Sequence, residues 1–456
     1  DGRAAEGNSL CACSVFYSMS AFAVSINTNE RQHCRVDISN REPSCKVSLR
    51  EEEVKMKRVL LICLALCVCF VNVAVAAELT PKEELGKALY FDVNLSEPSG
   101  QSCASCHDPD FGFVDPDSDI PVSEGVIPGL FGGRNSPSSA YAMYAPIFHF
   151  DATEGLWIGG QFWDGRATGD VLGDPLADQA LGPFLNPVEM ANASKAQVIA
   201  DIKDSSYAYL FEQVWGPESL DDVESAYDQV ALSIAAFERT ALFAPFSSKY
   251  DFYLQACLAN GGDKDDCAQG VGKVAQKTAK TIFDRDEYEG MQLFMGDALC
   301  FACHVVDWTD DPGNVIVPGW SPEGLVPPMF TDFTFDNLGV PKNTEYPLPL
   351  NAPADLGLGA IVEDPEENGK FKVMTLRNID LTAPYAHNGL FKTLKEITHF
   401  YNTRDVPGSL QKGADWAPPE YPDTINTDEL ANLGLTDEEE DAIVEFMKTL
   451  TDGYSP

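Results

Sequence analysis

The sequence contains "CASCH" at residues 103–107 and "CFACH" at residues 300–304. In each stretch two cysteines lie one helical turn apart, and a histidine follows the second cysteine directly. Two thiols at this spacing reach the two vinyl groups of one porphyrin, and the adjacent histidine then places its imidazole on the iron. We therefore predict two covalently attached haem c groups. The attaching cysteines and axial histidines are Cys103, Cys106 and His107 for the first haem, and Cys300, Cys303 and His304 for the second.

Two other interpretations of these cysteines are weaker. A thioredoxin-like redox pair needs no following histidine. A zinc site draws cysteines and histidines from separate segments, and a histidine adjacent to a bound cysteine fits one tetrahedron poorly. Two independent copies of the same pattern in one chain favour haem, with one haem in each of two domains.

The segments around these motifs have mostly helical periodicity. Two capping boxes predict helix starts, at Thr80 with Glu83 and at Thr436 with Glu439. Strand signals are sparse. The chain has 35 glycines and 30 prolines, and Gly/Pro-rich stretches predict long loops at 108–148 and 306–360. The fold class expected is mostly α, with two cytochrome c-like haem domains and long Gly/Pro-rich loops.

We expect an N-terminal haem domain at 77–245, a linker or insertion at 246–285, and a C-terminal haem domain with a closing helix at 286–456. The insertion contains Cys257 and Cys267. In an oxidising compartment these two form a disulfide that contributes about 2–3 kcal/mol. Free thiols or metal ligands are the alternative.

The N-terminal region has the pattern of a secretory signal. A basic pair follows Met56, an apolar core spans 59–71, and small residues at 74–76 mark a cleavage site. We expect residues 56–76 to be the signal peptide and 1–55 to be a non-native or mis-assigned leader. A lipoprotein cysteine at Cys67 or Cys69 is less favoured, because no small residue precedes either one. The protein is thus expected to be exported to the periplasm or cell surface, with no transmembrane anchor.

The charge is strongly acidic, with 31 basic and 71 acidic residues and a net charge of −40. This balance argues against nucleic acid as a partner, because phosphate binding needs a basic surface. It favours a cationic partner, although a general solvated surface has the same composition.

Several further motifs occur together in a fixed order. They are "GGRNSPS" (132–138), "QFWDGRA" (161–167), "QALGPFLNPVEM" (179–190), "FKVMTLRNIDLTAPYAHNGLFKTLKEI" (371–397) and the C-terminal helix. With the two haem motifs, this set resembles the bacterial dihaem cytochrome c peroxidase and MauG family over nearly the full length after residue 76. The resemblance implies that hydrogen peroxide reacts at the N-terminal haem.

The resemblance also assigns roles around that haem. Glu189 matches the distal acid–base residue, which takes a proton from peroxide and delivers it to the leaving oxygen. Gln179 matches an amide that hydrogen-bonds the bound oxygens, and Pro183 matches a proline that shapes the pocket. Trp163 matches a tryptophan that relays electrons between the haems, and its alternative role is simple core packing.

Conventional peroxidases of this family cap the first iron with a loop histidine between the haem motif and the "RN.P" segment. Residues 108–134 contain no histidine or methionine, and His149 follows the segment. We therefore expect an open first haem and a packing or loop position for His149. This feature resembles the MauG-like branch.

The second haem needs a sixth ligand. In conventional relatives a methionine lies nineteen residues after the threonine of "LTAP", and here that position is Tyr401 in "THFYN" (398–402). His399 is two residues earlier, and on a helix the two side chains point about 200° apart. Tyrosine, as in the MauG-like branch, is a hard ligand that favours oxidised iron. A surface position for Tyr401, or ligation by Met374, is the alternative.

The resemblance further implies a calcium ion held by Asn135 and by the backbone carbonyls of Thr382 and Pro384, since calcium prefers such oxygens. The alternative is a turn asparagine with no metal. The surface tryptophan from which MauG-like enzymes pass oxidising equivalents is replaced by Ala298, and Trp308 is a candidate substitute.

Three functions remain open. The first is a MauG-like enzyme that uses peroxide to oxidise an aromatic residue, such as a tryptophan, of a partner protein. The second is a conventional peroxidase supplied with electrons by a small cytochrome c or a cupredoxin. The third is a dihaem electron carrier, which an open first haem with Glu189 disfavours.

Overall fold

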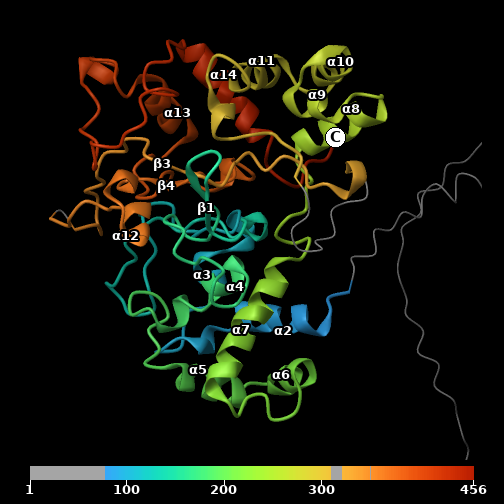
Figure 1. The fold of residues 1–456 in the computed structure, drawn as a ribbon, viewed down its shortest axis with the longest axis vertical. Coiled ribbons are helices and arrows are strands. Elements are labelled where there is room, and N and C mark those ends of the chain that lie inside the picture. Colours follow the sequence, from blue (N-terminus) through green and yellow to red (C-terminus); the bar gives the residue numbers. More distant parts are fainter. Residues whose placement is uncertain (1–77, 310–320, 350) are drawn as a thin grey trace, which may run out of the picture. The chain divides into compact units, whose positions relative to one another are not determined.

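The computed structural model describes residues 78–309, 321–349 and 351–456 (Figure 1). The predicted leader at 1–55 and signal peptide at 56–76 lie outside the described residues. The described residues belong to one compact unit built on two hydrophobic cores.

Helices dominate the described chain. They are α2 (Pro81–Tyr90), α3 (Cys103–Cys106), α4 (Pro175–Ala180), α5 (Lys195–Asp204), α6 (Ala208–Trp215), α7 (Val223–Glu238), α8 (Lys249–Ala259), α9 (Lys264–Gln269), α10 (Gly272–Ile282), α11 (Arg285–Phe294), α12 (Leu358–Val362), α13 (Leu394–Thr403) and α14 (Asp437–Lys448). Both predicted capping boxes are present, at the starts of α2 and α14. The mostly helical prediction is therefore confirmed for the described residues.

Each core is organised by a pair of crossing helices that includes the helix preceding a haem motif. In the first pair α2 lies against α7, and in the second α11 lies against α14 (Figure 1). A glycine stands at each crossing. A Cβ on Gly86 would lie 1.9 Å from the Ser233 carbonyl oxygen, and a Cβ on Gly290 would lie 1.8 Å from that of Ala442. Only glycine permits backbones to approach this closely.

Replacing Gly290 with valine is expected to lower the free energy of unfolding by about 1–3 kcal/mol or more, because the helices must separate to admit the side chain. Urea denaturation of the holoenzyme measures the change. Glu289→Val is the matched control, since it adds the same side chain at an exposed neighbour on α11 and should change stability by less than about 0.5 kcal/mol. Equal losses in both variants would contradict the crossing argument.

The segment 246–285, expected as a linker or insertion, folds into α8, α9 and α10. Their buried side chains, including Tyr250, Tyr253 and Ala279, belong to the second core. Cys257 and Cys267 are fully buried there and form a disulfide with an S–S distance of 2.05 Å. The disulfide thus joins α8 to α9.

Four short strands form two antiparallel pairs. β1 (His149–Asp151) pairs with β2 (Leu156–Ile158), and Phe150 lies opposite Trp157. β3 (Phe335–Asp336) pairs with β4 (Phe371–Lys372), and Phe335 lies opposite Lys372. The β1–β2 hairpin lies next to β3 (Figure 1), because the Gly159 amide donates to the Phe333 carbonyl at 2.9 Å. Among the helices described, none is long and apolar enough to span a membrane.

Candidate functional site

Each haem motif opens onto its own cavity. Cys103, Cys106 and His107 line a cavity of about 350 Å³ beside the first core. The second cavity, of about 190 Å³, is lined by the motif residues Cys300, Cys303 and His304. The cysteines and the histidine of each motif therefore face one common space, as covalent attachment of a single porphyrin requires.

The two motif histidines are held in the same way. The Nδ1–H of His107 donates to the Phe113 carbonyl at 3.2 Å, and that of His304 donates to the Phe330 carbonyl at 2.8 Å. Both phenylalanines have a left-handed backbone, with φ of 62° and 56°. This hydrogen bond fixes the tautomer, so that the Nε2 lone pair of each imidazole is free for a metal.

The protonation of these groups also suits haem. Burial lowers the pKa of His107, and it lowers the pKa of His304 to about 4, so both imidazoles are neutral. Burial raises the pKa of the Cys106 and Cys300 thiols to about 12, so these remain neutral thiols. Neutral imidazoles and neutral paired thiols on a cavity wall fit a thioether-linked haem at both sites.

The first cavity brings together the predicted peroxide residues. Gln179 lies on α4, and Pro183 and Glu189 lie in the following loop. All three line the cavity that His107 lines. The loop after the first haem motif supports this arrangement, since the Val126 amide donates to the Glu189 carbonyl at 2.8 Å.

Glu189 has the electrostatic setting of an acid–base group. Burial raises the pKa of its carboxyl, while the charge of Arg166 and a 2.8 Å hydrogen bond from the Asn186 amide act in the opposite direction. Such opposed influences allow a carboxyl to change its protonation state during a reaction. Arg166 was within a motif recognised from the sequence, but its charge beside Glu189 was not anticipated.

Trp163 lies between the two cavities. It lines both of them, as does the segment 135–138. Its indole N–H donates to the Asn135 carbonyl at 2.9 Å, and its own carbonyl accepts from the Lys372 amide on β4 at 2.8 Å. These two hydrogen bonds hold the indole between the two cavities, which is the position that a relay between two haem groups requires.

The second cavity separates the two residues of "THFYN" that compete as ligands. Tyr401 lines the cavity, and burial together with Cys303 and Asp336 raises the pKa of its phenol well above the usual range. His399 is on another face of α13, where Nδ1 meets a Glu440 carboxylate oxygen at 2.8 Å and Nε2 meets the Ser409 carbonyl at 3.2 Å. Met374 also lines the cavity.

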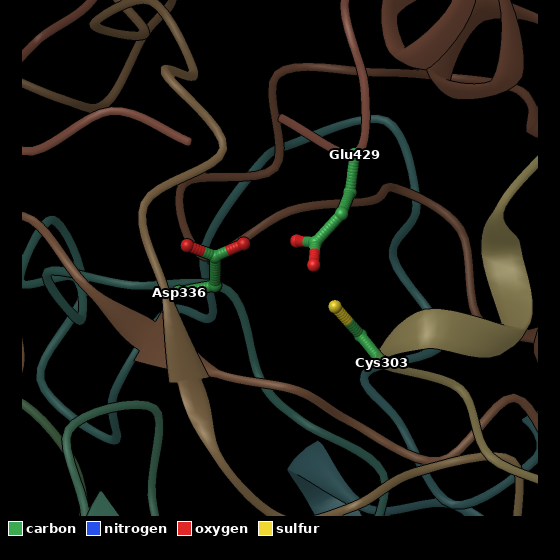
Figure 2. A group of neighbouring side chains, drawn as sticks. All are labelled: Cys303, Asp336 and Glu429. Carbon is green, nitrogen blue, oxygen red and sulfur yellow. The ribbon is translucent and has the colours of Figure 1, made fainter. Parts of the chain in front are cut away.

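Two carboxyl groups lie beside the second haem motif. Figure 2 shows the side chains of Cys303, Asp336 and Glu429 pointing toward one another. The amide of Asn426 donates to both carboxylates, at 2.7 and 2.6 Å. A free Cys303 in this arrangement would suit a metal ion, but a thioether-linked Cys303 has no thiolate to offer. The cluster then forms an acidic border to the cysteine edge of the second cavity.

The predicted calcium residues lie near one another. Asn135 and Pro384 line a small third cavity of about 10 Å³, and Thr382 is two residues before Pro384. Asp115 and Asp117 line the same space. Their carboxylates are hard oxygen donors that the sequence reasoning did not include.

Three buried ionisable residues on the cavity walls were not anticipated. Glu238 at the end of α7 lines the first cavity, and burial raises its pKa to about 8. Lys372 and His387 line the second cavity. Burial lowers the pKa of Lys372 to about 7, while its Nζ donates to the Gly160 carbonyl at 2.7 Å. The His387 ring stacks on Phe371.

Two other predicted positions are placed outside the cavities. His149 is exposed on β1, and its Nδ1 meets the Ile147 carbonyl at 2.8 Å, so it lies on a strand and not in the packing or loop position that was expected. Trp308, the candidate substitute for a surface tryptophan, is only 9% exposed and donates its indole N–H to the Lys264 carbonyl at 3.0 Å. Ala298, in contrast, is buried in the wall of the second cavity.

Comparison with known proteins gives one family. Residues 80–257 match the sequence profile described as di-haem cytochrome c peroxidase. The chain is 36% identical to the methylamine utilization protein MauG of Paracoccus denitrificans, over 82% of this chain and 89% of the relative. It is 29% identical to the cytochrome c551 peroxidase of Nitrosomonas europaea, over 83% and 82% of the two chains.

Solved structures give the same result. The crystal structure of the diheme peroxidase BthA from Burkholderia thailandensis matches with a TM-score of 0.65 and 31% identity, over 83% of this chain and 87% of that one. The two haem motifs, the two cavities and these similarities all indicate the same family. The chain therefore belongs to the dihaem cytochrome c peroxidase and MauG family and is a haem-dependent oxidoreductase.

Proposed function

We propose that the protein reacts with hydrogen peroxide at the first cavity and uses the resulting oxidising equivalents to oxidise an aromatic residue, such as a tryptophan, of a partner protein. Haem, when bound at the four cysteines, supplies the iron that cleaves the peroxide O–O bond and holds these equivalents. Peroxide consumes two protons and two electrons in forming two waters. The chain's own side chains move these protons and relay the electrons.

Glu189 moves the proton. As a carboxylate it accepts a proton from peroxide, and as a carboxylic acid it returns that proton to the leaving oxygen. Gln179 orients the peroxide oxygens through its amide, and Pro183 shapes the wall of the cavity. Trp163, which lines both cavities, passes single electrons from the second site to the first.

One observation favours this function over electron donation by a small redox protein. Tyr401 lines the second cavity, whereas both ring nitrogens of His399 have partners elsewhere. Burial strongly disfavours a phenolate, so the ionised side chain forms only against a cation such as ferric iron. A hard anionic ligand stabilises oxidised iron. The second site then stores oxidising equivalents rather than accepting electrons from a high-potential donor.

The test is to add one equivalent of peroxide to the oxidised holoenzyme with no electron donor and to follow its absorption. The proposal predicts one high-spin and one low-spin haem at rest, and an oxidised state that persists after peroxide is consumed. Rapid turnover with reduced cytochrome c and no persistent state would contradict it.

Tyr401→Phe is expected to abolish the persistent oxidised state, since phenylalanine offers no oxygen to the iron. Stopped-flow absorption measures its lifetime. His399→Phe is the matched control on the same helix and should leave the lifetime unchanged. A persistent state in Tyr401→Phe would show that Tyr401 is not the ligand.

The conventional peroxidase is the second candidate, and Met374 favours it because this residue also lines the second cavity. A thioether ligand favours reduced iron and acceptance of electrons from a small cytochrome c or cupredoxin. Met374→Leu separates the two candidates. If Tyr401 is the ligand, Met374→Leu should leave the persistent oxidised state unchanged. If Met374 is the ligand, the substitution should abolish turnover with reduced cytochrome c.

We further propose a calcium ion held by Asn135 and the carbonyls of Thr382 and Pro384, with Asp115 and Asp117 nearby.

We also propose that the protein is exported to the periplasm or cell surface. The disulfide between Cys257 and Cys267 supports an oxidising compartment.

A further inference from the structure

Apolar side chains are exposed on and beside the β1–β2 hairpin. Ile147 is 49% exposed, Phe150 is 48% exposed and Leu156 is 41% exposed. Trp157 is half-buried and pairs in register with Phe150, on the hairpin face away from Leu156, with its ring 5.3 Å from that of Phe150. Exposed aromatic pairs of this kind occur at interaction surfaces, where tryptophan and phenylalanine are enriched.

A continuous row of aromatic rings runs inward from this tryptophan. The Trp157 ring stacks on Phe148 at 4.9 Å between centroids, with an interplanar angle of 10°. Phe148 in turn meets Phe335 of β3 edge to face at 5.9 Å. Phe335 is 5% exposed, so the row passes from the surface into the interior.

The inner end of the row lies at the loop that carries Trp163. A Cβ on Gly165 would be 2.8 Å from Phe335 and 2.9 Å from Phe148, so both rings pack on this glycine, two residues after Trp163. Phe335 also pairs in register with Lys372, whose amide donates to the Trp163 carbonyl. The hairpin is fixed to the same loop, because the Phe148 amide donates to the Thr168 carbonyl at 2.9 Å. Packed atoms thus connect Trp157 to the loop that carries Trp163.

The charged side chains of the hairpin segment itself are acidic. Residues 136–163 contain Asp151 and Glu154 and no lysine or arginine. Asp151 holds the turn by accepting from the Thr153 amide at 2.7 Å, and Glu154 is exposed at its tip. An exposed aromatic pair on a segment that carries only negative charge complements a basic partner.

We propose that Trp157 is the residue through which oxidising equivalents leave the molecule, and that the hairpin docks a basic protein presenting an oxidisable aromatic side chain. This inference rests on the proposed function. Trp157 gives one electron inward through the ring row toward Trp163 and takes one from the partner's aromatic residue, which loses a proton to solvent. Two such transfers supply the two electrons that one peroxide consumes.

The test uses two synthetic peptides, one with tyrosine flanked by lysines and one with tyrosine flanked by glutamates. After one equivalent of peroxide, the lysine peptide should speed decay of the oxidised holoenzyme. In Trp157→Phe this acceleration should be lost, because the phenylalanine ring packs similarly but is much harder to oxidise. Trp215→Phe, a half-buried tryptophan on α6, is the matched control and should keep the acceleration.

Two readouts do not depend on turnover. In the resting holoenzyme, Glu154→Lys should weaken binding of a dye-labelled lysine peptide and strengthen binding of the glutamate peptide, as measured by fluorescence anisotropy. Peptide mapping after peroxide alone should find oxygen added to Trp157 and not to Trp215. Unmodified Trp157, or binding unaffected by Glu154→Lys, would count against the hairpin.

Failure of the inference is distinguishable from failure of the proposed function. If the wild-type holoenzyme forms no persistent oxidised state, the proposed function is wrong and the inference falls with it. If the state forms and Trp157→Phe reacts with the lysine peptide as fast as wild type, only the exit through Trp157 is wrong. Loss of the acceleration in Trp308→Phe alone would move the exit to that tryptophan.

Discussion

Glu189→Gln is expected to lower the second-order rate constant for reaction with hydrogen peroxide by about 10²–10⁴-fold, the usual contribution of a positioned acid–base group. Glutamine keeps the size of the side chain and an oxygen that accepts from Asn186, but it cannot take up or return a proton. Stopped-flow absorption of the holoenzyme under excess peroxide gives the rate constant.

The pH dependence provides a second signature. Burial raises the pKa of Glu189 above its ordinary value of 4.5, and the carboxylate is the form that accepts the proton. The wild-type rate constant should therefore fall as the pH drops through that raised pKa, and the Glu189→Gln profile should be flat over the same range.

Glu124→Gln is the matched control for Glu189. Glu124 lines the same cavity, and its carboxylate accepts from the Gly129 amide at 2.6 Å, which is a structural contact in a loop. We expect it to retain most of the peroxide reactivity. Equal losses in the two variants would mean that the total negative charge of the cavity matters, and not a proton transfer at Glu189.

Arg377→Met is expected to lower the free energy of unfolding by about 3–5 kcal/mol, because it leaves a buried carboxylate without its counter-charge. Arg377 and Asp251 form an ion pair at 2.7 Å, and both side chains are 0% exposed. The guanidinium also donates twice to the Pro328 carbonyl, at 2.9 and 2.7 Å. Rings of Tyr141 and Phe246 lie 5.6 and 5.0 Å from it.

Denaturant unfolding of the holoenzyme measures this loss. Arg285→Met is the control, since Arg285 is 86% exposed and should change stability by less than about 0.5 kcal/mol. The double variant Arg377→Met with Asp251→Asn should recover part of the loss, because it removes the unpaired charge. A stable Arg377→Met protein would show that the pair contributes nothing net.

Much of the site could be predicted from short stretches. The spacing of two cysteines and a histidine specifies haem attachment within five residues, because the thiols and the imidazole must reach one porphyrin. The caps at Thr80 and Thr436 are equally local, since each involves groups three residues apart. Tyr401 followed from the resemblance, which places the sixth ligand nineteen residues after the threonine of "LTAP", and the opposite placement of His399 followed from helix geometry.

Other features depend on residues far apart in the chain, for which the sequence has no local pattern. Arg377 meets Asp251 across 126 residues, and Lys372 reaches the Gly160 carbonyl across 212. The pKa of Glu238 reflects the burial of its carboxyl, which no neighbour in sequence reveals. The left-handed backbones of Phe113 and Phe330 were likewise not predictable, because phenylalanine has no preference for that conformation.

Local sequence was therefore enough to place the two haem attachment sites, the starts of helices and the candidate side chains for acid–base and ligand roles. These properties depend on chemistry within one or two turns of chain. The folded chain was needed to show that Trp163 lies between two cavities, that Tyr401 rather than His399 faces the second one, and that a row of rings runs from Trp157 at the surface to the loop that carries Trp163. Those properties depend on burial and on contacts between distant segments, which exist only once both cores have packed.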